Sequence, residues 1–111
     1  MADDAGDLID RFFETLNSRD LESLRELLAD DVEFRMPQGK TLRGADEAQA
    51  IIAAVEKIDL RLSPTGERQV EGGTVRVPVR ELTHGRDAVE GTAEFEVRDG
   101  RVAAFHVATE P

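Results

Sequence analysis

The first half of the chain carries its hydrophobic residues at helical spacing. Within 7–17 they recur three and four positions apart, which places them on one face of a helix. This face consists of Leu8, Ile9, Phe12, Phe13 and Leu16. The polar residues 17–20 end the helix, and Ser18 or Asp20 caps a second helix predicted over 21–29. A third apolar stripe predicts a helix over 45–57.

The second half alternates apolar and polar residues with a period of two, which predicts β-strands. A first strand already follows the second helix over 32–36, after Asp30 and Asp31, which we expect to end that helix. Pro64 and Gly66 interrupt the next strand, which is typical of a sheet edge. The later strands are predicted over 60–70, 75–83, 89–98 and 101–108.

Helices early in the chain and a run of antiparallel strands late in it predict an α+β fold in a single domain over residues 1–111. The sheet must bury one face against the three helices. The chain has five Phe and no Trp or Tyr, so few large side chains can fill the space between the layers. We therefore expect a strongly curved sheet with a hollow at its centre, of roughly a few hundred Å³.

Composition narrows the function classes. Lys and Arg number 14 against 24 Asp and Glu, and the net charge of −10 argues against nucleic acid or an anionic membrane as a partner. The chain has no Cys and two His, so disulfides, thiolate chemistry and a zinc site are not expected, nor is a cofactor. No apolar run reaches the ~20 residues of a membrane span. The acidic N-terminus lacks the pattern of a signal peptide, so we expect a cytoplasmic protein.

Three stretches carry a more specific pattern. They are RFFETLNSRDLESLRELLADDVEF, TLRGADEAQAII and the closing FEVRDGRVAAFHV. Together they resemble the nuclear transport factor 2-like superfamily, and within it the ketosteroid isomerase and SnoaL-like polyketide cyclase branch. The resemblance implies a cystatin-like α+β barrel, in which a cone-shaped, curved antiparallel sheet wraps three N-terminal helices and encloses an apolar pocket. It also implies a homodimer packed through the outer face of the sheet.

The resemblance does not carry the isomerase activity with it. Ketosteroid isomerases use a carboxylate base and an oxyanion hole made by a Tyr and a protonated Asp. Matched to this sequence, the Tyr falls at Phe12, the base at Met36 and the oxyanion-hole acid at Ala93. None of these side chains can donate the hydrogen bond or accept the proton. We therefore expect the fold and an apolar pocket without ketosteroid isomerase chemistry.

Glu81 is the remaining candidate for chemistry in the pocket. It is in phase with Val77 and Val79, so on a strand it shares their face and can serve as a general acid or base. The alternative is that the strand has already reached solvent at Glu81, or that an Arg neutralises it. His106 is out of phase with Phe105, and we expect it on the outer face at a dimer contact. The epoxide hydrolases of this superfamily need an Asp-Arg-Asp set inside the pocket. This sequence has no Asp or Arg in phase with the inward-facing residues, so we do not expect such a site.

Three functions remain open from the sequence. The first is a domain that binds a small hydrophobic molecule, with Glu81 as a polar anchor. The second is an enzyme that acts on a polyketide-like or steroid-like substrate by proton transfer at Glu81. The third is a dimerisation or docking module without a ligand. The predicted pocket residues are Phe12, Leu16, Phe34, Met36, Val55, Val77, Val79, Glu81, Ala93, Phe95 and Phe105.

Overall fold

The structure, a computed structural model, describes residues 4–35 and 41–109 and has the predicted α+β architecture. The helices are α1 (Asp4–Ser18), α2 (Leu21–Glu26), the short 3₁₀ helix η1 (Ala45–Glu47) and α3 (Ala48–Lys57). The strands are β1 (Leu28–Arg35), β2 (Thr41–Arg43), β3 (Arg61–Pro64), β4 (Gln69–Glu71), β5 (Thr74–Leu82), β6 (Val89–Arg98) and β7 (Arg101–Thr109).

The second helix is shorter than its leucine pattern predicts. It ends at Glu26 with Leu27 as its C-cap, and residues 28–31, expected in the helix or at its end, belong to β1. The backbone N–H of Val102 donates to the carbonyl of Leu27 at 2.8 Å, and Leu28 pairs with Val102 across to β7. Pairing with β7 therefore overrides the helical spacing of the leucines, a tertiary effect that local propensity does not contain.

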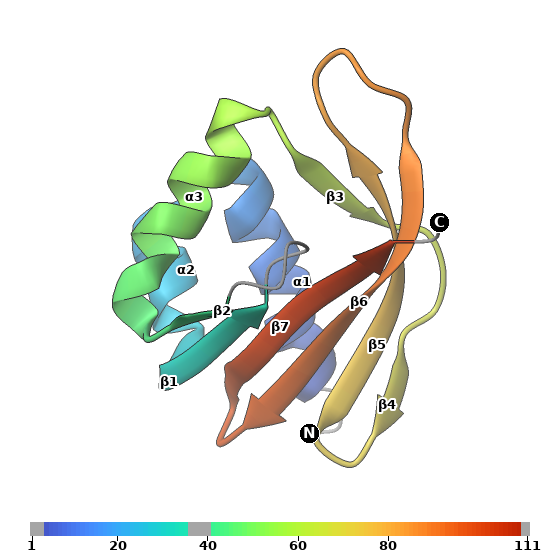
Figure 1. Ribbon diagram of the computed structural model, residues 1–111. Helices are drawn as coiled ribbons and strands as arrows, with labels where there is room; N and C mark the ends of the chain where they lie inside the picture. The colour runs from blue at the N-terminus through green and yellow to red at the C-terminus, as the bar shows by residue number, and fades with distance from the viewer. Residues whose placement is uncertain (1–3, 36–40, 110–111) are drawn as a thin grey trace.

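The strands form one open, strongly curved sheet that wraps α1, while α2 and α3 lie across its open side (Figure 1). The strand order is β2-β1-β7-β6-β5-β3, and β4 also pairs with β5. The sheet is mixed rather than wholly antiparallel, because β1 runs parallel to β7. Most of the chain separates these two strands, so no tight turn forces them to be antiparallel.

An irregularity near the start of β7 changes which side chains face the helices. Glu96 pairs with Ala104 and Val97 pairs with Val102, which leaves Ala103 as an extra residue in β7. The alternation predicted from Phe105 and Val107 therefore does not continue to Ala103. Instead, Val102 is fully buried on the inner face.

All five phenylalanines gather in one cluster at the centre of the curved sheet. The ring of Phe12 lies 5.1 Å from that of Phe95 and 4.8 Å from that of Phe105, measured between centroids. Phe13 packs edge-on against Phe95, and Phe34 packs against Phe105. The centre that we expected to be hollow is thus largely filled, because α1 presents two adjacent rings to the rings of β6 and β7.

Candidate functional site

The free space next to this cluster is a small cavity between α3 and the inner face of the sheet, called here the inner cavity. Its volume is about 100 Å³, smaller than the few hundred Å³ expected from the sequence. The lining is apolar apart from two charged residues, Arg35 and Glu81. The apolar lining residues are Leu16, Phe34, Ile51, Val55, Leu60, Leu62, Phe105 and Val107.

The predicted pocket residues divide into several groups in the structure. Five line the inner cavity: Leu16, Phe34, Val55, Glu81 and Phe105. Four others pack in the core beside it: Phe12, Val79, Ala93 and Phe95. Val77 is buried in the core and also lines a separate cleft against α1. Met36 lies outside the described residues. Whether a ligand occupies the cavity stays a prediction.

Glu81 lies on β5 where the strand leaves the core. Val79 is fully buried, whereas Glu81 is half-buried and lines both the inner cavity and an adjoining space of about 570 Å³, called here the outer cleft. Among the described residues, none forms a hydrogen bond or ion pair with its carboxylate. Glu81 is therefore a partly desolvated carboxylate at the junction of the two spaces, neither fully exposed nor neutralised by an Arg.

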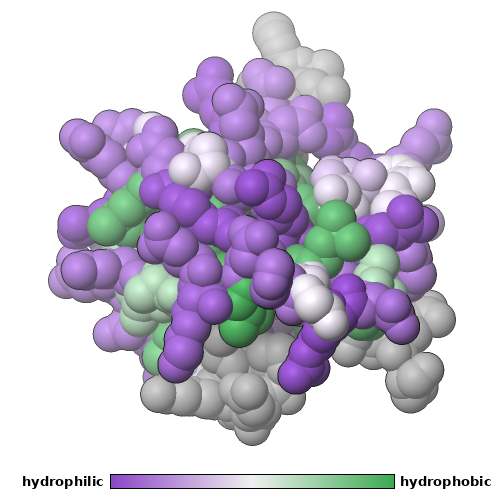
Figure 2. Space-filling model, turned by 90° about the horizontal axis from the view of Figure 1, so that it is seen from above, coloured by the Kyte–Doolittle hydropathy of each residue, from purple (hydrophilic) through white to green (hydrophobic). Residues whose placement is uncertain are grey.

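The outer cleft lies between the end of α3 and the loop that joins β5 to β6. The backbone N–H of His84 in that loop donates to the carbonyl of Ile58 at 3.1 Å, which ties the loop to the end of α3. Ile58 and Val89 line the cleft and are 48% and 39% exposed, unusually high for such residues. Seen from above, this end of the molecule is hydrophilic with separate hydrophobic areas between the charged side chains (Figure 2).

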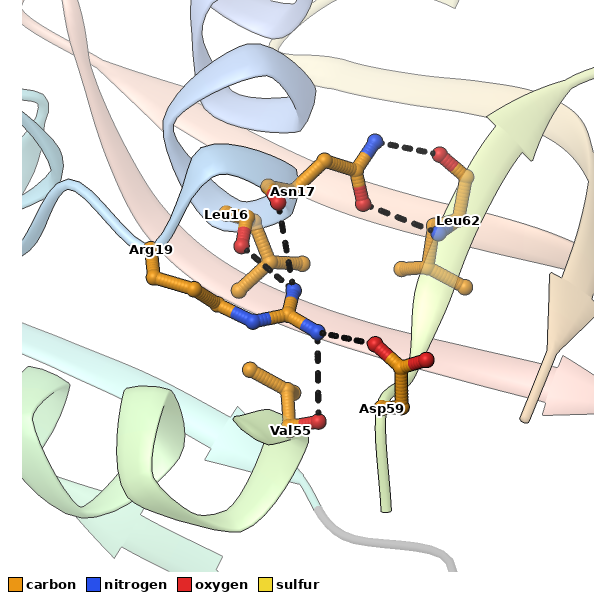
Figure 3. A network of polar contacts seen from close by, with 6 residues as sticks. All are labelled: Leu16, Asn17, Arg19, Val55, Asp59 and Leu62. Carbon is orange, nitrogen blue, oxygen red and sulfur yellow. Dashed lines mark hydrogen bonds and ion pairs between the residues drawn. The ribbon is translucent and has the colours of Figure 1, made fainter. Parts of the chain in front are cut away.

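A network of polar contacts holds the wall of the inner cavity in place (Figure 3). The side-chain amide of Asn17 donates to the carbonyl of Leu62 at 2.9 Å and accepts from its N–H at 3.0 Å. Arg19 donates to the carbonyls of Leu16 and Val55 and contacts Asp59 at 3.6 Å. Since Leu16, Val55 and Leu62 all line the cavity, Asn17 and Arg19 fix the positions of three of its walls.

The backbone at Arg19 explains why this network forms. Arg19 adopts φ 62°, the left-handed conformation in which helices commonly end, usually at a Gly. The N–H of Arg19 donates to the carbonyl of Leu16 and that of Asp20 to the carbonyl of Thr15, so two carbonyls of the last turn of α1 are satisfied. The Asp20 carboxylate then accepts from the N–H of Ser23 and caps α2, as one of the two predicted caps. The polar stretch 17–20 is thus a helix stop, a helix cap and a cavity support together.

The outer face of the sheet carries ion pairs rather than an apolar patch. Arg76 pairs with Glu94 and Arg80 with Glu90, each at 2.8 Å. His106 lies on this face as predicted, opposite Glu94 in the register, with 3.9 Å between its Nδ1 and a carboxylate oxygen of Glu94. His106 therefore points away from the inner cavity, and its side chain is not among the residues that line the cavity beside Glu81.

Sequence reasoning missed several residues that line the inner cavity. Ile51 was predicted to be buried on the third helix, but the pattern does not distinguish a core position from a cavity wall. Leu62 belongs to the edge strand β3, which Asn17 holds by two hydrogen bonds, and Leu60 directly precedes that strand. Arg35 alternates with the apolar Phe34 in the sequence, which predicts it on the polar face of its strand, yet it contributes to the lining at the end of β1. The strand ends there, so alternation no longer separates the two faces.

The part of the chain that the structure describes contains neither a metal-binding cluster nor a membrane-spanning helix. Within the described ranges, no three His, Cys, Asp or Glu side chains lie together so that they could hold a metal ion. None of the helices there has the length and apolar character that crossing a membrane requires.

The arrangement of three helices on a curved, open sheet defines a nuclear transport factor 2-like protein, and solved structures share it. A putative polyketide cyclase from Sinorhizobium meliloti has a TM-score of 0.81 at 23% identity, over 92% of this chain and 94% of its own. A putative ketosteroid isomerase from Kribbella flavida has a TM-score of 0.77 at 26% identity, and the match covers 94% of this chain and 76% of its own. A nuclear transport factor 2-like protein of unknown function from Burkholderia pseudomallei has a TM-score of 0.81 at 25% identity, and the match covers 99% of this chain and 92% of its own.

The family model for the SnoaL-like domain matches residues 9–105, which is most of the chain. The chain therefore belongs to the SnoaL-like domain family. No curated protein matches it. A shared fold of this kind hosts many functions, so the activity must be argued from the site.

Proposed function

We propose that this SnoaL-like domain binds a small hydrophobic molecule in the inner cavity, with Glu81 as its polar anchor. The observation that supports this most is the combination of an apolar cavity with one unpaired carboxylate at its mouth. Ligand sites are commonly apolar spaces with a few polar groups that set orientation. The outer cleft gives such a molecule a way in past Glu81.

The volume limits the ligand. Sites for drug-sized ligands measure ~300–1,000 Å³, whereas the inner cavity measures about 100 Å³. An engineered apolar cavity of about 150 Å³ in another protein binds benzene. The inner cavity is smaller than that, so it takes a short branched chain, or a single ring that extends partly into the outer cleft, and a fused polyketide or steroid ring system does not fit without movement of α3.

Two measurements test this proposal. Mass spectrometry of small molecules extracted from the purified protein should find a compound of this size. Titration with benzyl alcohol, followed by NMR of the ¹⁵N-labelled protein, should shift the amides of the lining residues. Val107→Phe fills the inner cavity and should abolish these shifts, while Val70→Phe, at an exposed position, should leave them unchanged. Shifts that persist in folded Val107→Phe would place the binding elsewhere and contradict the proposal.

The enzyme alternative rests on the same carboxylate. A half-buried Glu beside an apolar cavity is placed to move a proton on a bound substrate. Glu81→Gln should then abolish turnover of the extracted compound and leave its binding nearly intact. The isomerase route through Phe12 and Ala93 is not proposed, because both side chains are apolar and buried in the core.

A ligand-free dimerisation module is the third candidate, and a homodimer is also compatible with ligand binding. The outer sheet face would form its interface, with the Arg76–Glu94 and Arg80–Glu90 pairs at the contact. Sedimentation velocity should then show a dimer that Thr92→Arg disrupts, because Thr92 lies on this face between the two pairs. A monomer at all concentrations would refute this proposal without affecting the ligand proposal.

A further inference from the structure

The charge of Glu81 stands apart from the acidic charges around it. On the neighbouring strand, Glu90 is paired with Arg80 and Glu94 with Arg76. The carboxylate of Glu81 has no such partner among the described residues, although it is half-buried. Keeping a partly desolvated charge without a partner costs free energy. A group of opposite charge on a ligand would remove this cost.

The cationic residues near Glu81 do not already fill that role. Arg35 lines the inner cavity, and Lys57 and Arg86 line the outer cleft. All three are exposed, and none forms an ion pair with Glu81. Water screens their charges more strongly than the half-buried charge of Glu81. The net charge of −10 also favours the approach of a cation over that of an anion.

The surroundings of Glu81 suit an ammonium group with an apolar substituent. The inner cavity and the adjoining part of the outer cleft together have room for one ring or a short branched chain beside the carboxylate. Phe34 and Phe105 line the inner cavity with their ring centroids 6.5 Å apart, and these apolar rings suit the apolar substituent. The outer cleft leaves the other side of the ammonium group open to water.

We propose that the ligand is a small organic amine, whose protonated amino group lies at the Glu81 carboxylate and whose apolar substituent enters the inner cavity. This inference rests on the proposed function, since it requires that the inner cavity binds a ligand. It adds the charge of the ligand and the orientation in which it enters. Neutral and anionic molecules with the same substituent are the competing classes.

Three probes with the same ring separate these classes: benzylamine, benzyl alcohol and benzoate. Each is titrated at pH 7 and low ionic strength into the full-length protein, with affinity measured by NMR shifts. A charge-assisted hydrogen bond to a half-buried carboxylate should make benzylamine bind about tenfold more tightly than benzyl alcohol. Benzoate should bind more weakly than either. Raising the salt concentration should reduce only part of the benzylamine advantage, because the carboxylate is partly shielded from ions.

Two variants assign the preference to Glu81. Glu81→Gln should reduce the affinity for benzylamine to that for benzyl alcohol, and should change the affinity for benzyl alcohol by less than about twofold. Glu96→Gln makes the same change in net charge at an exposed position on β6, without an ion pair in the described chain. This control should leave the preference for benzylamine in place.

The outcomes separate the two proposals. If benzyl alcohol binds in the inner cavity and benzylamine binds no more tightly, the amine inference fails and the proposed function stands. Tightest binding of benzoate, or equal effects of Glu81→Gln and Glu96→Gln, would also overturn the inference. If none of the three probes binds, the proposed function fails together with it.

Discussion

Asn17 is the residue whose replacement tests most directly how the cavity is held together. Its side chain joins the last turn of α1 to β3 by two hydrogen bonds with the backbone of Leu62, at 2.9 and 3.0 Å. The side chain of Leu62 is 2% exposed and lines the inner cavity. Asn17→Ala removes both bonds and leaves a donor and an acceptor of an edge strand without their partner.

The cost follows from these two groups. Each hydrogen bond contributes about 1 kcal/mol net, and each partly buried group left unpaired costs about 1–3 kcal/mol. Water reaches the edge strand and offsets part of this cost, so we expect a loss of about 2–4 kcal/mol in the free energy of unfolding. For a chain of this size the melting temperature should fall by about 9–17 °C. Equilibrium urea denaturation with a common m-value measures the loss.

Ser18→Ala is the matched control on the same turn. The Ser18 hydroxyl donates only to Thr15 of its own helix, at 3.4 Å, so its removal should cost less than about 0.5 kcal/mol. A loss below about 1 kcal/mol for Asn17→Ala, or equal losses for the two variants, would show that the contact with β3 does not stabilise the fold. NMR of Asn17→Ala should also show the largest shifts in β3 and at Leu16, because these walls lose their common support.

Three further predictions use urea denaturation as the measurement. Phe12→Ala should cost about 3–5 kcal/mol, because the fully buried ring contacts Phe95 and Phe105; a loss under 2 kcal/mol would mean that the cluster collapses around the gap. Asp20→Ala should cost about 1 kcal/mol, because the cap on α2 is lost, and Asp20→Asn should cost less, because Asn can still cap the helix. Equal losses would mean that the negative charge of Asp20, and not its hydrogen bond to Ser23, stabilises α2. Gly72→Ala should cost about 1 kcal/mol from its φ of +60° alone, since nothing lies within 4 Å of the added Cβ, and Gly72→Asn should cost less.

The local pattern predicted the elements well and their ends less well. The stripe from Leu8 to Leu16 is buried on α1, and the break between the predicted strands 89–98 and 101–108 is a hairpin turn at Asp99 and Gly100, both with positive φ. The end of α2 and the extra residue Ala103 in β7 were not predictable, because both depend on pairing between segments far apart in the chain. Alternation within one strand carries no information about which partner that strand will meet.

The candidate site was harder to predict than the fold for a related reason. The hydrophobic pattern identifies residues that face inward, but it does not say how completely they fill the interior. Phe12 is on the same helical face as the cavity-lining Leu16, and Phe95 lies opposite the cavity-lining Phe105, yet both pack in the core, while Phe105 both packs in the cluster and lines the cavity. The difference depends on fitting rings from three elements together, and a change of one methylene in such packing is enough to open or close a space.

The filled centre also explains where chemistry can occur in this chain. A polar group at the position of Phe12 or Ala93 would have to be reached by a ligand in the middle of the sheet, and the phenylalanine cluster occupies that region. The remaining space lies under α3, and its charged lining residues, Glu81 and Arg35, are both at strand ends near its mouth. Under the proposed function, a ligand meets a charged group only as it enters the inner cavity. Phe12 and Ala93 belong to the packed interior, so the polar contact available to such a ligand is Glu81 at the entrance.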